Sequence, residues 1–158
     1  AHGVTLVADV RSHPASRRHP HFAARPLAAA LAAAGCGYRH LPDLGGLRVA
    51  RADSPHLGLP AGPFRGYADH MQGGAFAAAL AALLALAARG RVAAMCAEAD
   101  PANCHRRLLA DALLVAGARV EHVLDAGPRR PHAPDPGLVV ERGRLLYRGV
   151  QPGLPGLG

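Results

Sequence analysis

The stretch RVAAMCAEADPANCHRRLLADALLVAG, residues 91–117, decides the fold. Its first six residues, Arg91–Cys96, form a short apolar run of the kind found in buried strands. The segment AEADPA then turns the chain. Residues 103–117 have helical apolar spacing, with Asn103 as the expected N-cap and Gly117 as the stop. A buried strand followed directly by a helix is the building unit of α/β folds.

The same alternation continues on both sides of this stretch. Strands are expected at VTLVADV (4–10), YRHLP (38–42) and VEHVL (120–124), and helices at RPLAAALAAAG (25–35) and AFAAALAALLALAA (75–88). The Gly/Pro-rich residues 43–66 are expected to form a long loop, which in a compact domain is usually functional or mobile. LVVERGRLLY is expected to form a hairpin that turns at Arg142-Gly143.

These elements predict one Rossmann-like α/β domain over residues 1–150, followed by a flexible tail over 151–158. The domain should be a three-layer sandwich with a mostly parallel sheet and a C-terminal β-hairpin. The most apolar run, residues 75–88, is shorter than the roughly 20 residues of a membrane span, so we interpret it as a packed helix and expect no membrane contact.

The chain is basic, with a formal net charge of +7 and a pI near 10.6. This charge permits a polyanionic partner such as nucleic acid. However, all 18 basic residues are arginine, and there is no lysine or isoleucine, as in proteins from GC-rich genomes. Some of the arginines could therefore simply cover a solvated surface. Three cysteines and a start unlike a signal peptide predict a reduced, cytoplasmic protein.

Polar residues follow the ends of three predicted strands. In an open parallel sheet, ligands bind outside the carboxyl ends of the strands. The residues that should meet at this edge are Asp9, Arg11, Ser12, Asp43, Gly45, Gly46, Arg48, Cys96, Glu98, Cys104, His105 and Arg106. The last three are expected in the first turn of a helix, whose free N–H groups attract anions and lower the pKa of a nearby thiol.

Each candidate has a chemical and a plainer interpretation. Cys96 or Cys104 could be a thiolate nucleophile, or a small packing residue. Glu98 and His105 could transfer protons, or only bond to neighbouring groups. Arginines 11 and 106 could bind an anion. A zinc site of Cys96, Cys104 and His105 has poor ligand spacing without a CxxC pair, so no metal and no obligatory cofactor are expected.

Several ordered motifs resemble one family. The motifs are VADVRSHPASRRHPHF, YRHLPDLGGLR, FRGYADHM, VAAMCAEADPANCHRRLLADAL and VEHVL, and they cover about residues 4–123. Together they are similar to the domain of unknown function 488. The resemblance implies a bacterial or archaeal cytosolic α/β protein and assigns no activity. The resemblance places family motif positions on all the edge residues above except Asp43. It adds Pro14, Ser16, Tyr67 and Met71 to them. We expect Tyr67 to reach the pocket from the long loop.

The resemblance also concerns the start of the chain. Family members usually begin with a strand similar to TIGHS and a helix, before the part that matches AHGVTLVADVR. We therefore expect this first strand and helix to be missing here, which would leave a sheet edge exposed. The missing Gly-His-Ser would belong to the same pocket.

Three functions remain open from the sequence. The first is a small enzyme with a Cys/Glu/His/Arg pocket for an anionic, nucleotide-like or nucleic-acid substrate. The second is a nucleic-acid-binding module without chemistry, in which the scarcity of aromatic residues argues against base stacking. The third is a sulfur carrier similar to rhodaneses, although nine residues separate Cys96 from Arg106. Cys96 and Cys104 could also pair as a redox-sensitive disulfide.

Overall fold

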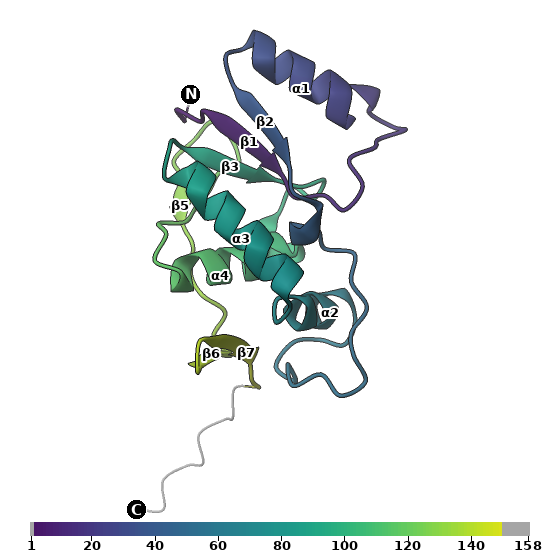
Figure 1. Cartoon of the computed structure of the whole chain (residues 1–158), viewed down its shortest axis with the longest axis vertical. Coiled ribbons are helices and arrows are strands. Elements are labelled where there is room, and N and C mark those ends of the chain that lie inside the picture. The colour runs from purple at the N-terminus through teal and green to yellow at the C-terminus, as the bar shows by residue number, and fades with distance from the viewer. Residues whose placement is uncertain (1, 150–158) are drawn as a thin grey trace, which may run out of the picture.

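Three parallel strands form the central sheet in a computed structural model of the chain, which describes residues 2–149 (Figure 1). The strands β1 (Leu6–Asp9), β2 (Gly37–His40) and β3 (Val92–Met95) are ordered β2-β1-β3. Asp9 at the end of β1 lies opposite both His40 and Met95. The carboxyl ends of all three strands therefore meet at one edge, as the sequence predicted.

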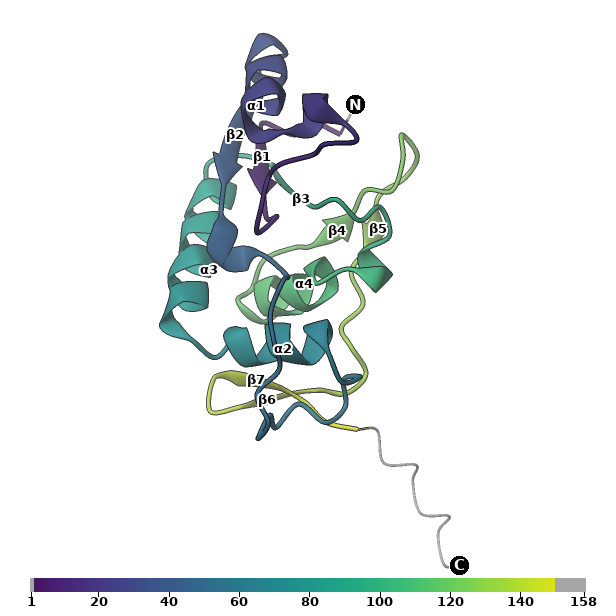
Figure 2. The same cartoon turned by 90° about the vertical axis from the view of Figure 1, so that its right-hand side faces the viewer.

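Helices cover both faces of this sheet and make the predicted three layers. Helix α1 (Ala24–Ala33) joins β1 to β2 on one side, and α3 (Gly74–Ala87) and α4 (Arg106–Val115) lie on the other (Figures 1 and 2). The crossover from β1 to β2 and the crossover from β2 to β3 run in opposite directions across the sheet, so right-handed connections place their helices on opposite faces. Helix α1 is followed by Gly35, whose φ of +72° suits a residue without a side chain.

The long connection after β2 contains a helix that the sequence analysis missed. Helix α2 (Pro63–His70) begins with proline in its first turn, where a missing N–H costs nothing. The expected loop over residues 43–66 thus ends earlier, and Tyr67 lies on a helix rather than on a loop. Short 3₁₀ turns also occur at Pro20–Phe22, Pro42–Leu44 and Pro101–Asn103.

The fourth predicted strand does not join the parallel sheet. Strand β4 (Glu121–His122) pairs instead with β5 (Arg130–Pro131) in a separate antiparallel ribbon. The Pro-rich connector folds back on β4, where Nε2 of His122 lies 2.9 Å from Nδ1 of His132. This side-chain contact adds to the backbone pairing of β4 with β5.

The C-terminal hairpin forms where the sequence predicted it. Strands β6 (Leu138–Glu141) and β7 (Arg144–Tyr147) are antiparallel. Arg142 and Gly143 both have positive φ, 51° and 76°, which is the type I′ geometry preferred between two paired strands. The expected tail over 151–158 lies outside the residues that the structure describes.

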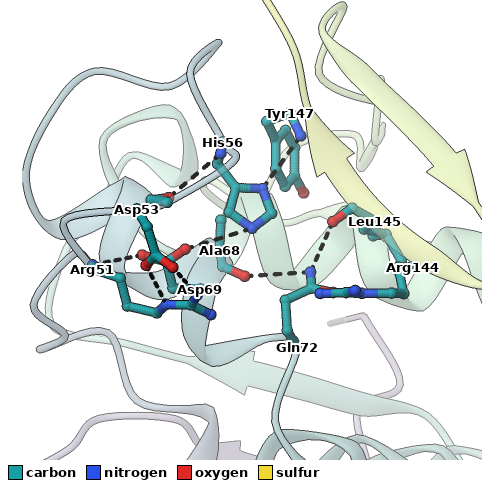
Figure 3. A network of polar contacts seen from close by, with 10 residues as sticks. Arg51, Asp53, His56, Ala68, Asp69, Gln72, Arg144, Leu145 and Tyr147 are labelled. Carbon is teal, nitrogen blue, oxygen red and sulfur yellow. Dashed lines mark hydrogen bonds and ion pairs between the residues drawn. The ribbon is translucent and has the colours of Figure 1, made fainter.

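Polar contacts fix this hairpin beneath α2 (Figures 2 and 3). The amide of Tyr147 donates to Nδ1 of His56 at 3.4 Å. Gln72, just after α2, donates to the carbonyl of Leu145 at 2.8 Å and accepts from Nε of Arg144 at 2.9 Å. The hairpin is therefore attached to both the long loop and the end of α2.

The core fills the space between the sheet, α2, α3 and α4. Its largest buried apolar and aromatic members are Leu44, Tyr67, Phe76, Leu83, Leu108, Leu109 and Tyr147. Within residues 2–149 no single helix is long and apolar enough to cross a membrane, and α2 with α3 meets those criteria only as a pair bent by 81°.

Candidate functional site

The carboxyl edge of the sheet brings together a cluster of two thiols and an imidazole. The donor atoms of Cys96, Cys104 and His105 all lie within 4.8 Å of one another. Cys96 follows the end of β3, and the other two residues directly precede α4. These three residues lie at the edge where the sequence places them, and the fold brings all three side chains together.

Short local bonds hold the loop between the two cysteines. Asp100 caps the 3₁₀ turn by accepting the amide of Ala102 at 2.9 Å. The prediction of Asn103 as the N-cap of this helix is wrong. Its side chain donates to Asp100 at 3.2 Å. His105 occupies the N-cap position of α4. The helix therefore begins two residues later than a cap at Asn103 would allow, with Cys104 and His105 outside its first turn.

Cys104 sits where two N–H groups of Arg106 converge. Its Sγ accepts from the amide at 3.5 Å and from the guanidinium Nε at 3.3 Å. A hydrogen bond from Cys96 and these two bonds lower the pKa of Cys104 to about 6, although burial opposes the change. These bonds favour the thiolate form of Cys104. The N–H group at the start of α4, where the sequence predicts attraction of an anionic ligand, points at a thiol of the protein itself.

Cys96 has the opposite character. Its hydrogen bond to Cys104 and its burial raise the pKa of Cys96 to about 11. The two thiols therefore differ in acidity: the thiolate form is favoured at Cys104 and the protonated form at Cys96. Two neighbouring thiols whose pKa values are driven apart are suited to different roles in one reaction.

His105 presents one ring nitrogen to the thiolate. Its Nε2 lies 3.2 Å from the carbonyl of Val10, which can only accept, so Nε2 carries the ring proton. Its Nδ1 then faces Sγ of Cys104 at 3.6 Å with a lone pair. The ring also packs against that of Tyr67, with centroids 5.0 Å apart. A proton that reaches this gap is within range of both nitrogen and sulfur.

Two glycines shape the wall of the cluster. A Cβ atom on Gly45 would collide with the side chain of Ser12, and one on Gly46 would collide with the ring of His105. Ser12 also receives a long bond of 3.4 Å from the amide of Leu47. The Gly-Gly pair therefore lets the loop after β2 approach the site, while Tyr67 lies behind it and donates to the carbonyl of Leu44 at 3.0 Å.

The other predicted arginines already have protein partners. Arg11 forms a two-pronged pair with buried Asp9, at 2.9 and 2.6 Å, and donates to the carbonyl of Phe22 at 2.9 Å. Arg48 donates to the carbonyls of Gly45 and Pro42. These guanidinium groups brace strand ends and turns, which leaves fewer of their donors for a substrate.

Glu98 stands apart from the thiol cluster. It is exposed, and its carboxylate accepts the amide of Asp100 at 3.1 Å. Its backbone carbonyl receives the guanidinium of Arg106. Glu98 thus positions Arg106 through its main chain. Asp43 is likewise exposed and contributes its carbonyl to His70 at 2.6 Å.

The thiol cluster has the donor chemistry of a soft-metal site. Two sulfur atoms and one imidazole nitrogen within 4.8 Å could hold zinc with a fourth position open. The spacing of these residues in the sequence argued against a metal, yet the loop that separates Cys96 from Cys104 brings them together in space. The structure describes three donors here, so a fourth ligand would have to come from solvent or substrate.

A second polar network was not predicted at all. Asp111, which is 1% exposed, accepts from Nε2 of His132 at 2.7 Å, from the hydroxyl of Tyr147 at 3.0 Å and from the amide of Asp135 at 3.2 Å. His122 extends the network through His132. The residues that bond to Asp111 lie far along the chain, so the sequence does not reveal the network. Its one available signal is an aspartate on the apolar face of LLADALL.

Two cavities lie beside helix α4. One of about 740 Å³ is bordered by β3, α3, α4 and β4, and one of about 490 Å³ lies between α4 and the Pro-rich connector. Neither is lined by Cys96, Cys104 or His105. Because Cys104 is only 4% exposed, a reactant must be small to touch its sulfur.

Comparison with known proteins gives one match. The family model described as Domain of unknown function DUF488 matches residues 1–113, which is most of the chain. No curated protein and no solved structure is similar enough to count as a match. The matched region contains the parallel sheet, the Gly-Gly turn and both cysteines of the cluster. The chain therefore belongs to the DUF488 family.

Proposed function

We propose that this protein is a small thiol enzyme in which Cys104 is the nucleophile. The observation that carries the proposal is the pair of N–H bonds from Arg106 to Sγ of Cys104 at the start of α4. A thiolate is a far better nucleophile than a thiol, and the same two bonds remain in place as it approaches a substrate. Nucleophilic chemistry therefore fits the cluster better than simple anion binding.

The neighbouring residues take supporting roles in this proposal. His105 is the proton carrier, because its Nδ1 lone pair faces the reacting sulfur at 3.6 Å. Arg106 stabilises the thiolate and the negative charge of a departing group. Glu98 keeps Arg106 in place through its carbonyl. Ser12, Gly45, Gly46 and Tyr67 form the wall against which His105 is held.

A direct test is the ionisation of the thiols. Thiolate ultraviolet absorbance should be titrated for the wild-type chain, Cys104→Ser, Cys96→Ser and Cys36→Ser. We expect a transition near pH 6 that disappears only in Cys104→Ser. If the wild-type chain shows no thiolate below pH 8, the proposal fails.

A second candidate is contact with nucleic acid through the segment before α1. Arg17, Arg18 and Arg25 are exposed and have no ion-pair partner among residues 2–149. Between them, the rings of His21 and Phe22 lie 4.5 Å apart, and Phe22 is 46% exposed. Cations beside exposed rings suit phosphate and base contacts.

Salt dependence tests this second candidate. If these arginines bind phosphates, affinity for a single-stranded oligonucleotide should fall steeply as salt increases, and Arg17→Ala with Arg18→Ala should flatten the slope by about two phosphate contacts. Arg89→Ala with Arg142→Ala, at two other exposed positions, is the control that removes the same number of charges. Affinity that barely responds to salt would exclude this function.

A further inference from the structure

The thiol pair has three properties that together limit its reaction. Sγ of Cys104 accepts two N–H bonds from Arg106 and is almost fully buried, so only a small reactant can reach it. Sγ of Cys96 lies within 4.8 Å of Sγ of Cys104. His105 offers a lone pair to the same gap. A buried nucleophile with a protonated thiol at its side is equipped to receive one small electrophilic atom and then release it.

We propose that Cys104 and Cys96 are the attacking and resolving cysteines of a site that reduces hydrogen peroxide or a comparably small hydroperoxide. This inference rests on the proposed function, because it requires Cys104 as the nucleophile, and it names the substrate class of that same site. The conversion leaves a disulfide between the two residues, which a thiol reductant must reopen.

In the first step the thiolate sulfur of Cys104 attacks one oxygen of the peroxide. An S–O bond forms, the O–O bond breaks, and the departing hydroxide takes up a proton to leave as water. The sulfur of Cys104 is oxidised to a sulfenic acid and the peroxide is reduced. The guanidinium of Arg106, whose Nε lies 3.3 Å from the sulfur, is placed to stabilise the charge on the departing oxygen.

In the second step Cys96 resolves the sulfenic acid. The Cys96 thiol gives its proton to Nδ1 of His105, and its sulfur attacks the sulfur of Cys104. An S–S bond forms, the S–O bond breaks, and hydroxide leaves with the proton that His105 returns, as a second water. Two equivalents of a thiol reductant then open the disulfide by exchange and restore both thiols.

The local structure permits the closure that this step requires. A disulfide needs its sulfur atoms about 2.05 Å apart, so the two Sγ atoms must approach by less than 3 Å. The connecting segment from Ala97 to Asp100 is exposed and is held by short bonds of its own, such as that from Asp100 to Glu98. These residues lie outside β3 and α4, so a change in their backbone need not unwind either element.

The experiment uses the full chain, reduced and treated with a chelator, then exposed to hydrogen peroxide and read by mass spectrometry, which detects oxygen added to a buried sulfur without a bulky trap. In the wild type we expect a Cys96–Cys104 disulfide by non-reducing peptide mapping and little sulfenic or sulfinic acid. Cys96→Ser should instead accumulate sulfenic or sulfinic acid on Cys104. Cys104→Ser should leave Cys96 reduced, and Cys36→Ser should behave as wild type.

The rate supplies a second criterion. Because two N–H groups of Arg106 point at Sγ of Cys104, hydrogen peroxide should consume Cys104 faster at pH 7 than it consumes free cysteine, and a rate no faster than that of free cysteine would overturn the inference. Cys96→Ala serves as a second resolving-residue variant if Cys96→Ser does not fold, as judged by circular dichroism.

Each other outcome overturns the inference. Equal oxygen addition to Cys104 in the wild type and Cys96→Ser would show that Cys96 does not resolve the sulfenic acid. If absorbance shows the Cys104 thiolate but peroxide leaves both thiols reduced, the proposed function survives and this inference fails; a persulfide formed with thiosulfate would then assign sulfur transfer. If neither thiol ionises below pH 8, both fail. If the thiols react only after zinc is removed and zinc rebinds tightly, the cluster is a metal site.

Discussion

Gly46 lies directly against the imidazole of His105, so that a Cβ atom on Gly46 would overlap Nδ1 of the ring. The contact joins the loop after β2 to the residue that caps α4. It also explains why a backbone without a side chain is needed at this point of the Gly-Gly turn. The position of the proton carrier thus depends on a residue that has no functional group of its own.

Replacing Gly46 should therefore disturb the site as well as the fold. Gly46→Ala should lower the free energy of unfolding by about 1–3 kcal/mol, because the added methyl forces the ring of His105 to move. Gly74→Ala is the matched control, since a Cβ atom there meets nothing within 4 Å and alanine favours the start of α3. Urea unfolding of both variants checks the difference; equal stabilities would contradict the contact.

The thiolate of Cys104 should depend on the charge of Arg106. Removing the guanidinium in Arg106→Ala leaves the backbone N–H bond but takes away the nearest positive charge, so the pKa of Cys104 should rise from about 6 by roughly one unit or more. Arg89→Ala, an exposed residue after α3, changes the net charge equally and should leave the titration unaltered. Thiolate absorbance against pH measures both.

The buried pair of Asp9 and Arg11 should be essential for stability. Asp9→Asn leaves the guanidinium, which is 9% exposed, without its charge partner, and this should cost about 3–5 kcal/mol. Asp53→Asn breaks the exposed pair with Arg51 and should change little. Chemical denaturation distinguishes the two; a small effect at Asp9 would mean that Arg11 finds other partners and is available to ligands.

The same pair predicts how the protein responds to strong acid. Burial alone would raise the pKa of Asp9, but hydrogen bonds from Arg11 and Tyr38 outweigh it and hold the pKa below the usual 3.8. The stabilisation is therefore complete above the unfolded pKa of about 3.9 and is lost as the pH falls below it. Stability of Asp9→Asn should be less sensitive to pH in that range than stability of the wild type.

Two histidines should weaken the fold in milder acid. Burial lowers the pKa of His56, and burial together with the charges of His132 and Arg106 lowers the pKa of His122. The unfolded chain then binds more protons, so stability is complete above about pH 6.5 and declines as the pH falls further. His122→Asn should reduce this slope, whereas His13→Asn, on an exposed loop, should not; thermal unfolding between pH 7 and 5 measures it.

The fold was predictable wherever the signal was local. Strand β1 lies within a β-branched apolar run, and the hairpin turn at Arg142-Gly143 needs two positive φ values that glycine makes easy. Helix α2 was not predicted because the segment PFRGYADH is short and contains Gly66. Its formation depends on packing: a Cβ atom on Gly66 would collide with the backbone of Arg48, and Tyr67 is fully buried.

The site was predictable in place more than in detail. Strand ends after Asp9 and Met95 had to meet in a parallel sheet, which located the cluster. The partners of each charge could not be read from the sequence. Arg11 turns back to Asp9 rather than outward, and β4 pairs with β5 rather than with the parallel sheet. Such choices depend on distances between residues far apart in the chain.

The bonds to the carboxylate of Asp111 also determine where the chain can be truncated. The family match ends at residue 113, but all three donors to Asp111 come from later residues, and Tyr147 is among them. In a fragment that ends at residue 113, the buried carboxylate of Asp111 would lose all three of these hydrogen-bond donors. The homologous region and the cooperative unit therefore have different limits, and amides in α4 and β7 should exchange with solvent as one block.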